Sequence, residues 1–375
     1  MMTTDARQQK ETGDGIVPAQ GIRRLVDQGC IRLAQPLSAN QVQPASLDLR
    51  LGAVAYRVRA SFLPAPEVSV AERIDDLALH QIDLTATAVL ETGCVYIVPL
   101  LEALELPSQI AASANPKSST GRLDVFTRVI ADGVNAFDQI PAGYHGRLFA
   151  EICPQTFPIV VRQGSTLSQI RFRMGEPAET DAALHELHDR ERLVVGDAAA
   201  DIQNGIALSV DLSGELAAIS NGLVGYRAKR NTNLVDVDAP ASCAIADYWE
   251  PIAAGNSNRL ILDPDQFYIL ASKEAVHVPP THAAEMVPFN PLVGEFRVHY
   301  AGFMDPGFGH APAGGAGARV VLEVRSHKVP FILEDGQIVG RLIYERMSDV
   351  PELLYGTGLG SHYQAQGLKL SKHFV

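Results

Sequence analysis

The stretch RLFAEICPQTFPIVVRQGSTLSQIRFRM, residues 147–174, decides the fold because its pattern occurs twice in this chain. Residues 319–347, RVVLEVRSHKVPFILEDGQIVGRLIYERM, repeat it and align Glu151 with Glu323, an offset of 172 residues. A repeat that stays in register over this length indicates two copies of one structural unit.

Two further pairs of segments extend the repeat toward the N-terminus. CVYIVPLLEALELP (94–107) matches QFYILASKEAVHVP (266–279), again at an offset of 172 residues. SLDLRLG (46–52) resembles LSVDLSG (208–214) at a shorter offset, and we expect Asp48, like Asp211 of the second copy, to fix a turn or an interdomain hydrogen bond. The length of 375 residues agrees with two domains, since a domain typically has roughly 100–200 residues.

The repeated segments predict short strands. PIVVRQG and PFILEDG contain β-branched and aromatic residues bounded by Pro, Gly and Asp, which is typical of strands and turns. Helical spacing is weaker and is confined to residues 21–33 and 182–193. We therefore predict a mainly β chain of two tandem domains with a few short helices.

The domain boundaries follow from changes in composition along the chain. We expect a disordered N-terminus (1–15), a first domain (16–175), a charged, Ala-rich linker (176–204), a second domain (205–350) and a C-terminal arm (351–375).

Composition excludes several classes of protein. The formal net charge of −12 argues against a nucleic-acid polymer as partner, because such binders usually have a basic surface. A few local Arg and Lys side chains can still bind a small anion. No apolar run reaches the roughly 20 residues that span a bilayer, so we expect no membrane association. The four cysteines are widely separated, which favours reduced thiols and a cytoplasmic location.

One polar stretch is a candidate binding site. NPKSSTGRLDVF (115–126) places Lys117, Ser118, Ser119 and Arg122 within a few residues of one another. Hydroxyl groups and cations suit phosphate oxygens, and Gly121 lets the backbone approach a ligand closely.

This stretch resembles the Arg-Ser-Ser segment, followed closely by Arg, of the dCTP deaminase branch of the dUTPase superfamily. A second family motif, an Asp-Pro-Gly-aromatic turn before a strand with the catalytic Glu, resembles residues 305–308 followed by Glu323. FDQIPAGYHGRLFAE (137–151) is its counterpart in the first half. The resemblance covers most of both halves, as in double-length bacterial members with two fused domains. It implies dUTPase-like β-barrels of the β-clip type that deaminate dCTP to dUTP and ammonia.

The resemblance also implies a role for each matching residue. Glu151 would be the general acid/base, and Ser118 and Arg122 would position the water and the amine. The substrate-binding set in the two halves would be Lys117, Ser119, Asp138, Tyr144, Asp305 and Glu323. Lys117 stands where the family usually has Arg, which keeps the charge but loses the bidentate geometry.

Two carboxylates compete for the catalytic position. Family sites form between barrels of a trimer, so a trimer-based homo-oligomer is implied. Ser118 and Arg122 could then be completed by Glu151 of a neighbouring first domain or by Glu323. We favour Glu151, because its half also contains the hydroxyl groups.

The C-terminal segment SHYQAQGLKLSKHFV (361–375) resembles the family arm that folds over the nucleotide. Tyr363, Gln366 and Lys369 are its candidate substrate contacts. The resemblance implies Mg²⁺ bound through the triphosphate. Zinc is not expected, because the sequence lacks the PCxxC motif and the paired cysteines of zinc-dependent cytidine deaminases.

Two alternatives remain open at this level. The first is dUTP diphosphate hydrolysis, alone or after deamination. The second is a non-catalytic nucleotide-binding regulatory module, because VPFNPLVGEF (287–296) in the second half has neither the Ser pair nor the Arg.

Overall fold

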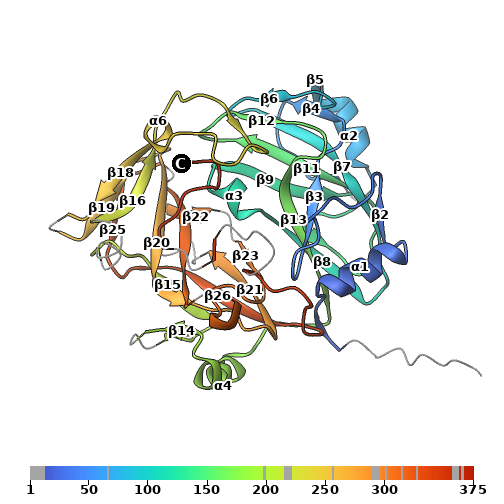
Figure 1. Ribbon diagram of the computed structural model, residues 1–375. Coiled ribbons are helices and arrows are strands. Elements are labelled where there is room, and N and C mark those ends of the chain that lie inside the picture. Colours follow the sequence, from blue (N-terminus) through green and yellow to red (C-terminus); the bar gives the residue numbers. More distant parts are fainter. Residues whose placement is uncertain are drawn as a thin grey trace, which may run out of the picture.

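The computed structural model describes residues 13–65, 67–196, 200–214, 222–255, 257–288, 296–299, 302–313, 316–326, 328–356, 363–364 and 367–375. The chain is mainly β, with a few short helices, as predicted. Figure 1 shows the first half, coloured blue to green, beside the second half, coloured yellow to red.

Along the residues that the structure describes, the first half consists of short strands and three helices. Its elements are β1 (Gly15–Ile16), α1 (Ala19–Asp27), β2 (Ile31–Leu33), β3 (Leu47–Arg50), β4 (Val54–Val58), α2 (Val70–Leu77), β5 (Ala78–Asp83), β6 (Ala88–Leu90), β7 (Val95–Glu105), β8 (Ile110–Pro116), α3 (Ser118–Gly121), β9 (Val125–Ala131), β10 (Gln139–Ile140), β11 (His145–Pro154), β12 (Ile159–Val161) and β13 (Thr166–Met174).

The second half repeats this order after a connecting helix. Its elements are α4 (Asp181–Glu191), β14 (Val194–Val195), β15 (Ile206–Ser209), β16 (Leu223–Ala228), β17 (Val235–Asp236), α6 (Ile245–Tyr248), β18 (Trp249–Ala253), β19 (Arg259–Leu262), β20 (Phe267–Val276), β21 (His282–Pro288), β22 (Phe296–His299), β23 (Phe303–Met304), η2 (Ala311–Ala313), β24 (Ala318–Ser326), β25 (Phe331–Glu334) and β26 (Ile338–Arg346).

Sheet topology confirms the internal duplication. One sheet of the first half has the order β5-β4-β7-β11-β9, and its counterpart in the second half has the order β18-β16-β20-β24-β22. The sheet β13-β8-β10 corresponds in the same way to β26-β21-β23, and the pair β6-β12 corresponds to β19-β25. The 172-residue offset in sequence is therefore an equivalence of strands in space.

Alternation along β11 shows how the repeated strand positions its side chains. Successive residues of a strand point to opposite faces of the sheet. Leu148, Ala150 and Ile152 face the first hydrophobic core, and Phe149 packs in a separate cluster on the other face. Glu151 shares the face of Phe149, which we call the outer face of the sheet.

The outer faces of the two equivalent sheets are covered differently. In the first half, Val70 and Ile74 of α2 pack on this face against Phe149. In the second half, Phe267, Ile269 and Val321 on the equivalent face belong to the core cluster of the first half. The second half therefore packs its outer face against the first half, whereas the first half covers its own with a helix.

An aromatic cluster joins the two halves. Trp249 is buried and its ring lies 5.4 Å from Phe157, 6.0 Å from Phe267 and 5.6 Å from Phe374, measured between centroids. Parallel pairing of β12 with β17 adds a backbone connection between the halves. The C-terminus consequently lies between the halves, near α3 (Figure 1).

Helix α2 begins with a capping box. The Ser69 hydroxyl accepts a hydrogen bond from the backbone N–H of Glu72, and the Glu72 carboxylate accepts one from the Ser69 N–H. The box satisfies two backbone donors that the first turn of a helix leaves without a partner.

Substituting Ser69→Ala should therefore lower the free energy of unfolding by about 1 kcal/mol. Urea denaturation followed by circular dichroism measures this change. Thr87→Ala, a substitution at an exposed loop position, is the control and should change the free energy of unfolding by less than about 0.5 kcal/mol. Equal midpoints for both variants would contradict the capping role.

Three segments differ from the sequence-based boundaries or lie partly outside the described residues. The expected linker forms α4, with Leu184 and Leu187 in the second core, and β14, which pairs with β20. The expected C-terminal arm places Leu370 and Phe374 in the first core. Residues 1–12 of the expected disordered N-terminus lie outside the described residues, and Gly15 pairs with Met174.

The helix predicted over residues 21–33 is shorter than expected. It ends at Asp27, and Gly29 has a φ of 75° in the left-handed region that glycine adopts without a steric penalty. Residues 31–33 form β2, which pairs with β7. No helix among the described residues is long and apolar enough to cross a membrane.

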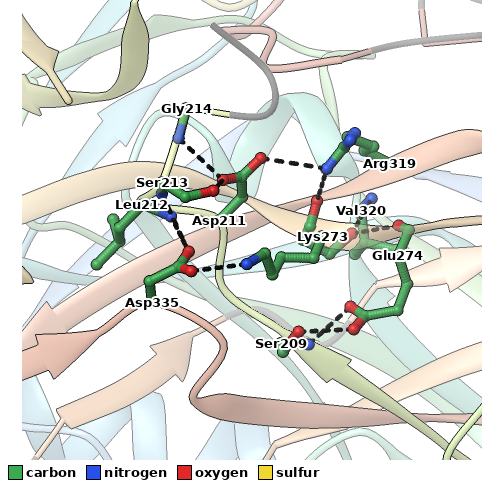
Figure 2. A network of polar contacts seen from close by, with 11 residues as sticks. Ser209, Asp211, Leu212, Ser213, Gly214, Lys273, Glu274, Arg319, Val320 and Asp335 are labelled. Atoms are coloured by element: carbon green, nitrogen blue, oxygen red, sulfur yellow. Dashed lines mark hydrogen bonds and ion pairs between the residues drawn. The ribbon is translucent and has the colours of Figure 1, made fainter. Parts of the chain in front are cut away.

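A polar network fixes the loop after β15, as expected for Asp211. Figure 2 shows Asp211 accepting hydrogen bonds from the Ser213 hydroxyl (3.1 Å) and from Arg319 (3.3 Å). Asp335 accepts one from the backbone N–H of Leu212 (2.8 Å) and pairs with Lys273 (2.6 Å). These contacts are local to the second half, which supports a structural role for Asp211.

Candidate active site

A cavity of about 570 Å³ lies between the two halves. Both halves and the C-terminal segment line it. Its polar and charged residues are Asn40, Gln43, Asp48, Lys117, Ser118, Ser119, Arg122, Gln169, Asp305, Glu323, Tyr355, Tyr363 and Lys372. Its size falls within the range of about 300–1,000 Å³ that is typical of small-molecule sites.

The first half contributes the short helix α3 and the residues on either side of it. Strand β8 ends at Pro116, and Lys117 has an extended backbone at the N-cap of α3. The helix is a single turn, so Ser118, Ser119 and Arg122 follow one another closely around it. All three line the cavity, as the sequence predicted.

Arg122 is buried at the contact between the halves. Its Nη1 donates to the backbone carbonyl of Lys369 at 2.9 Å, and its guanidinium carbon lies 3.9 Å from the centre of the Tyr363 ring. Its Nε lies 3.8 Å from Oε1 of Glu323. One guanidinium from the first half therefore contacts both the second half and the C-terminal segment.

Glu323 is the carboxylate that the structure brings to Arg122. It lies on the outer face of β24 and is 4% exposed. Burial raises the pKa of Glu323 to about 8, and Arg122 partly offsets this rise. A carboxyl group with a pKa near neutrality can both accept and donate a proton at physiological pH.

Two lysines and an aspartate form a charged group elsewhere in the cavity lining. The Lys117 ammonium pairs with Oδ2 of Asp48 and donates to Thr166 at 3.0 Å. Lys372 also lines the cavity, and burial followed by repulsion from Lys117 lowers its pKa. Oδ1 of Asp48 is buried and has no hydrogen-bond partner among the residues that the structure describes.

Asp305 and Tyr355 complete the contribution of the second half. Asp305 follows β23, and its Oδ1 lies 3.3 Å from Nη2 of Arg171. Burial raises the pKa of Asp305, and the charge of Arg171 opposes the rise. Burial also raises the pKa of Tyr355.

Glu151, the carboxylate favoured from the sequence, does not line this cavity. Its carboxylate lies on the outer face of the first sheet, where Oε1 accepts hydrogen bonds from Nη2 (2.6 Å) and Nε (3.1 Å) of Arg128. The Arg128 guanidinium stacks on Phe137 at 3.4 Å from the ring centre. Glu151 is 1% exposed within its own chain. Glu323, the other alternative, meets Arg122 directly.

Asp138 and Tyr144 also lie away from this cavity. Asp138 accepts a hydrogen bond from the backbone N–H of Val129 at 2.7 Å, and burial raises its pKa to about 7. The Tyr144 hydroxyl donates to the Arg147 carbonyl (2.7 Å) and accepts from the Asp132 N–H (3.1 Å). Both side chains satisfy backbone groups of the first half, and neither lines the cavity.

The C-terminal predictions have three outcomes. Tyr363 lines the cavity and stacks on Arg122. Lys369 contacts Arg122 through its carbonyl, and its ammonium does not line the cavity. Gln366 lies outside the described residues.

Six polar cavity residues escaped sequence reasoning: the three amides Asn40, Gln43 and Gln169, and the three titratable residues Asp48, Tyr355 and Lys372. Asp48 matched a turn-fixing aspartate in the second repeat, Tyr355 lies outside every motif, and Lys372 follows the candidate Lys369 by three residues. These three titratable residues come from a strand, a loop and the C-terminal segment, respectively. Only the packing of the two halves brings them together.

Two family models match this chain. The model of the 2'-deoxycytidine 5'-triphosphate deaminase (DCD) N-terminal domain matches residues 13–176, and that of the DCD C-terminal domain matches residues 180–374. The chain belongs to the 2'-deoxycytidine 5'-triphosphate deaminase family. Membership confirms the expectation of an enzyme that acts on dCTP, and the two family models match the two tandem halves.

Individual relatives of the deaminase family cover the chain to different extents. The crystal structure of 2'-deoxycytidine 5'-triphosphate deaminase from Agrobacterium tumefaciens is 58% identical and matches with a TM-score of 0.84 over 90% of this chain and 99% of its own. The dCTP deaminase of Natronomonas pharaonis is 30% identical over 42% of this chain and 80% of its own length. The Streptomyces coelicolor protein described as "dCTP deaminase, dUMP-forming" is 29% identical over the same shares.

Proposed function

We propose that this chain converts dCTP and water to dUTP and ammonia in the cavity between its halves, with Glu323 as general acid/base. The observation that supports this most directly is the meeting of Ser118 and Arg122 from the first half with Glu323 from the second in one buried site. Family membership supplies the substrate class.

The residues account for each proton of the reaction. The Glu323 carboxylate takes a proton from water as the oxygen attacks C4 of cytosine, and passes this proton to N3. The second proton of the water moves through Glu323 to the exocyclic amine. The C4–N4 bond then breaks, ammonia leaves, and the C4 carbonyl of uracil forms.

Arg122 and Ser118 act on the same atoms. The Ser118 hydroxyl can hold the water or the amine, because it both donates and accepts hydrogen bonds. Arg122 stabilises the ionised form of Glu323 and the negative charge that develops on the attacked ring, an effect that is strong in a buried site.

The lysines and Asp48 suit the triphosphate. Lys117, Lys372 and Ser119 provide cations and a hydroxyl for phosphate oxygens. Asp48 fits Mg²⁺, since its Oδ1 is a buried carboxylate oxygen without a hydrogen-bond partner and Mg²⁺ prefers oxygen ligands. When bound with the nucleotide, Mg²⁺ would neutralise phosphate charge. The proposed independence of zinc rests on the missing PCxxC motif.

The pH dependence of kcat/KM tests the role of Glu323. The base must be ionised, and the pKa of Glu323 in the free enzyme is about 8. We expect kcat/KM to rise about tenfold per pH unit below pH 8 and to level off above it, because kcat/KM reports the ionisation of the free enzyme. Ammonia release measured from pH 6 to pH 9.5 checks this. A flat profile across pH 7 to 9 would contradict the assignment.

A second function is favoured by one observation. Streptomyces coelicolor dCTP deaminase is described as dUMP-forming, so this chain is a candidate for diphosphate hydrolysis after deamination. Ammonia and pyrophosphate should be measured separately from dCTP and from dUTP. Ammonia without pyrophosphate supports simple deamination, and both products support the bifunctional enzyme. Tight binding of dCTP with neither product would support the regulatory module.

The assembly and the location stay predictions. A trimer-based homo-oligomer is expected from the family resemblance, and light scattering coupled to size-exclusion chromatography measures the mass in solution. The cytoplasmic location is likewise proposed from the spacing of the cysteines, and all four are free thiols in the structure.

A further inference from the structure

A second ion pair crosses the two halves beside the Arg122–Glu323 pair. Asp124 follows Arg122 by two residues in the first half, and Arg325 follows Glu323 by two residues on the same face of β24. The Arg325 Nη2 contacts Oδ2 of Asp124. The polarity is reversed relative to the first pair, so each half contributes one cation and one anion.

The second pair joins a buried aspartate to a half-buried arginine and is anchored on both sides. Asp124 is 1% exposed, and its carboxylate accepts a hydrogen bond from the Thr156 hydroxyl at 2.5 Å. Arg325 also donates to Thr156 at 2.9 Å, which closes a triangle of contacts. On its own half, Arg325 donates from Nη1 to the carbonyl of Asp265 at 2.9 Å.

The backbone at Asp124 shows that this residue is specifically placed. Its φ of 56° lies in the left-handed region, which a non-glycine residue adopts rarely and which Asp and Asn tolerate best. The backbone N–H of Gln155 donates to its carbonyl at 2.9 Å. The segment that leads out of the Arg122 turn is thereby held against the loop after β11.

The fold itself does not require an arginine at position 325. The equivalent position of the duplicated strand, 172 residues earlier, is Cys153, and β11 forms the same ladder without a cation there. Arg325 therefore serves the contact between the halves and not the strand.

We propose that Asp124, Thr156 and Arg325 are positioning residues that set the separation of Arg122 from Glu323. The inference rests on the proposed function. The distance of 3.8 Å between Nε of Arg122 and Oε1 of Glu323 is longer than a hydrogen bond. The pair of Asp124 with Arg325 lies two residues further along both segments and keeps the halves at this spacing. A displacement of about 1 Å in a site of this kind can lower a rate about 10²-fold.

The test uses the full chain with Arg325→Met and Asp124→Asn. Asn tolerates the left-handed backbone and has nearly the volume of Asp, so Asp124→Asn removes charge without backbone strain. We expect kcat for ammonia release from dCTP to fall about tenfold, within that 10²-fold limit, and KM to change less than about twofold. The acid limb of kcat/KM should move to higher pH, because a displaced Arg122 lowers the pKa of Glu323 less.

Two further variants separate positioning from stability. Arg325→Lys should recover most of kcat, because it restores a cation at the same site. The double variant Asp124→Asn, Arg325→Met should be no slower than the slower single variant, since both changes remove one contact. Arg227→Met, which breaks the exposed pair with Glu250, is the matched control and should leave kcat and the pH profile unchanged.

Several outcomes would overturn the proposal. A lower Tm with unchanged kcat and pH profile would show a structural role only, as would additive effects in the double variant. If Arg325→Met fails to fold, Asp124→Asn and Thr156→Val give the same readouts. Full activity of Glu323→Gln would overturn the proposed function itself, whereas full activity of Arg325→Met overturns only the positioning role.

Discussion

Glu323→Gln should lower kcat for ammonia release from dCTP by about 10²–10⁴-fold, the contribution that a general acid/base typically makes. Glutamine keeps the shape of the side chain and a carbonyl oxygen for Arg122, and it cannot accept the proton of the attacking water. Binding of dCTP should persist, because the substitution leaves Lys117 and Lys372, the residues proposed to bind the phosphates, unchanged. Ammonia release and isothermal titration of the variant with dCTP measure the two effects separately.

Glu151→Gln is the matched control for this substitution. Glu151 occupies the equivalent position of the duplicated strand, is equally buried and also pairs with an arginine, Arg128. Glu151→Gln should change kcat less than about twofold. Loss of a general acid/base lowers the rate about 10²–10⁴-fold, and in the proposed mechanism Glu151 touches no substrate atom. If Glu151→Gln is inactive and Glu323→Gln is active, the assignment of the carboxylate is reversed.

Arg122→Met should lower kcat/KM by about 10²–10³-fold, the loss typical of removing one preorganised charge from an active site. Methionine fills similar volume but cannot stabilise the ionised Glu323. The substitution also removes the hydrogen bond to the Lys369 carbonyl and the stacking on Tyr363, so the C-terminal segment should become more accessible to protease. Steady-state kinetics and limited proteolysis of the free enzyme measure both effects.

Arg227→Met serves again as the control, because Arg227 is half exposed and its pair with Glu250 lies outside the cavity. Exposed ion pairs contribute about 0–1 kcal/mol to stability, so neither kinetics nor proteolysis should change measurably. Unchanged kcat/KM in Arg122→Met would remove Arg122 from the mechanism.

Much of the architecture follows from local pattern. Successive side chains of a strand face opposite sides of the sheet, so Glu151 lies on the face opposite Leu148 and Ala150. The repeat gives Glu323 the equivalent place on its own strand. The predicted linker differs because α4 buries Leu184 and Leu187, an apolar pair among charged residues. Composition over a window of this length does not reveal two inward-facing leucines.

The candidate site was predictable only in part. Lys117, Ser118, Ser119 and Arg122 are adjacent in sequence, so one turn brings them to one place. Asp138 and Tyr144 follow the family motif in sequence but satisfy backbone groups inside the first half. Lys372 lines the cavity from the C-terminal segment, and Tyr355 lines it from a loop. Their spacing in the sequence does not predict that they lie near α3.

The sequence by itself determined the duplication, the mainly β class, the family and the polar turn at residues 117–122, because each depends on residues close together in the chain. Only the tertiary structure brings one of the two glutamates, Glu323, to Arg122 in the cavity. Equivalent strands present equivalent carboxylates, and the difference lies in what covers each sheet: α2 and Arg128 enclose Glu151, whereas the first half itself packs over Glu323 and brings Arg122 to it. Contacts between segments some 200 residues apart arise from packing, which no local pattern encodes.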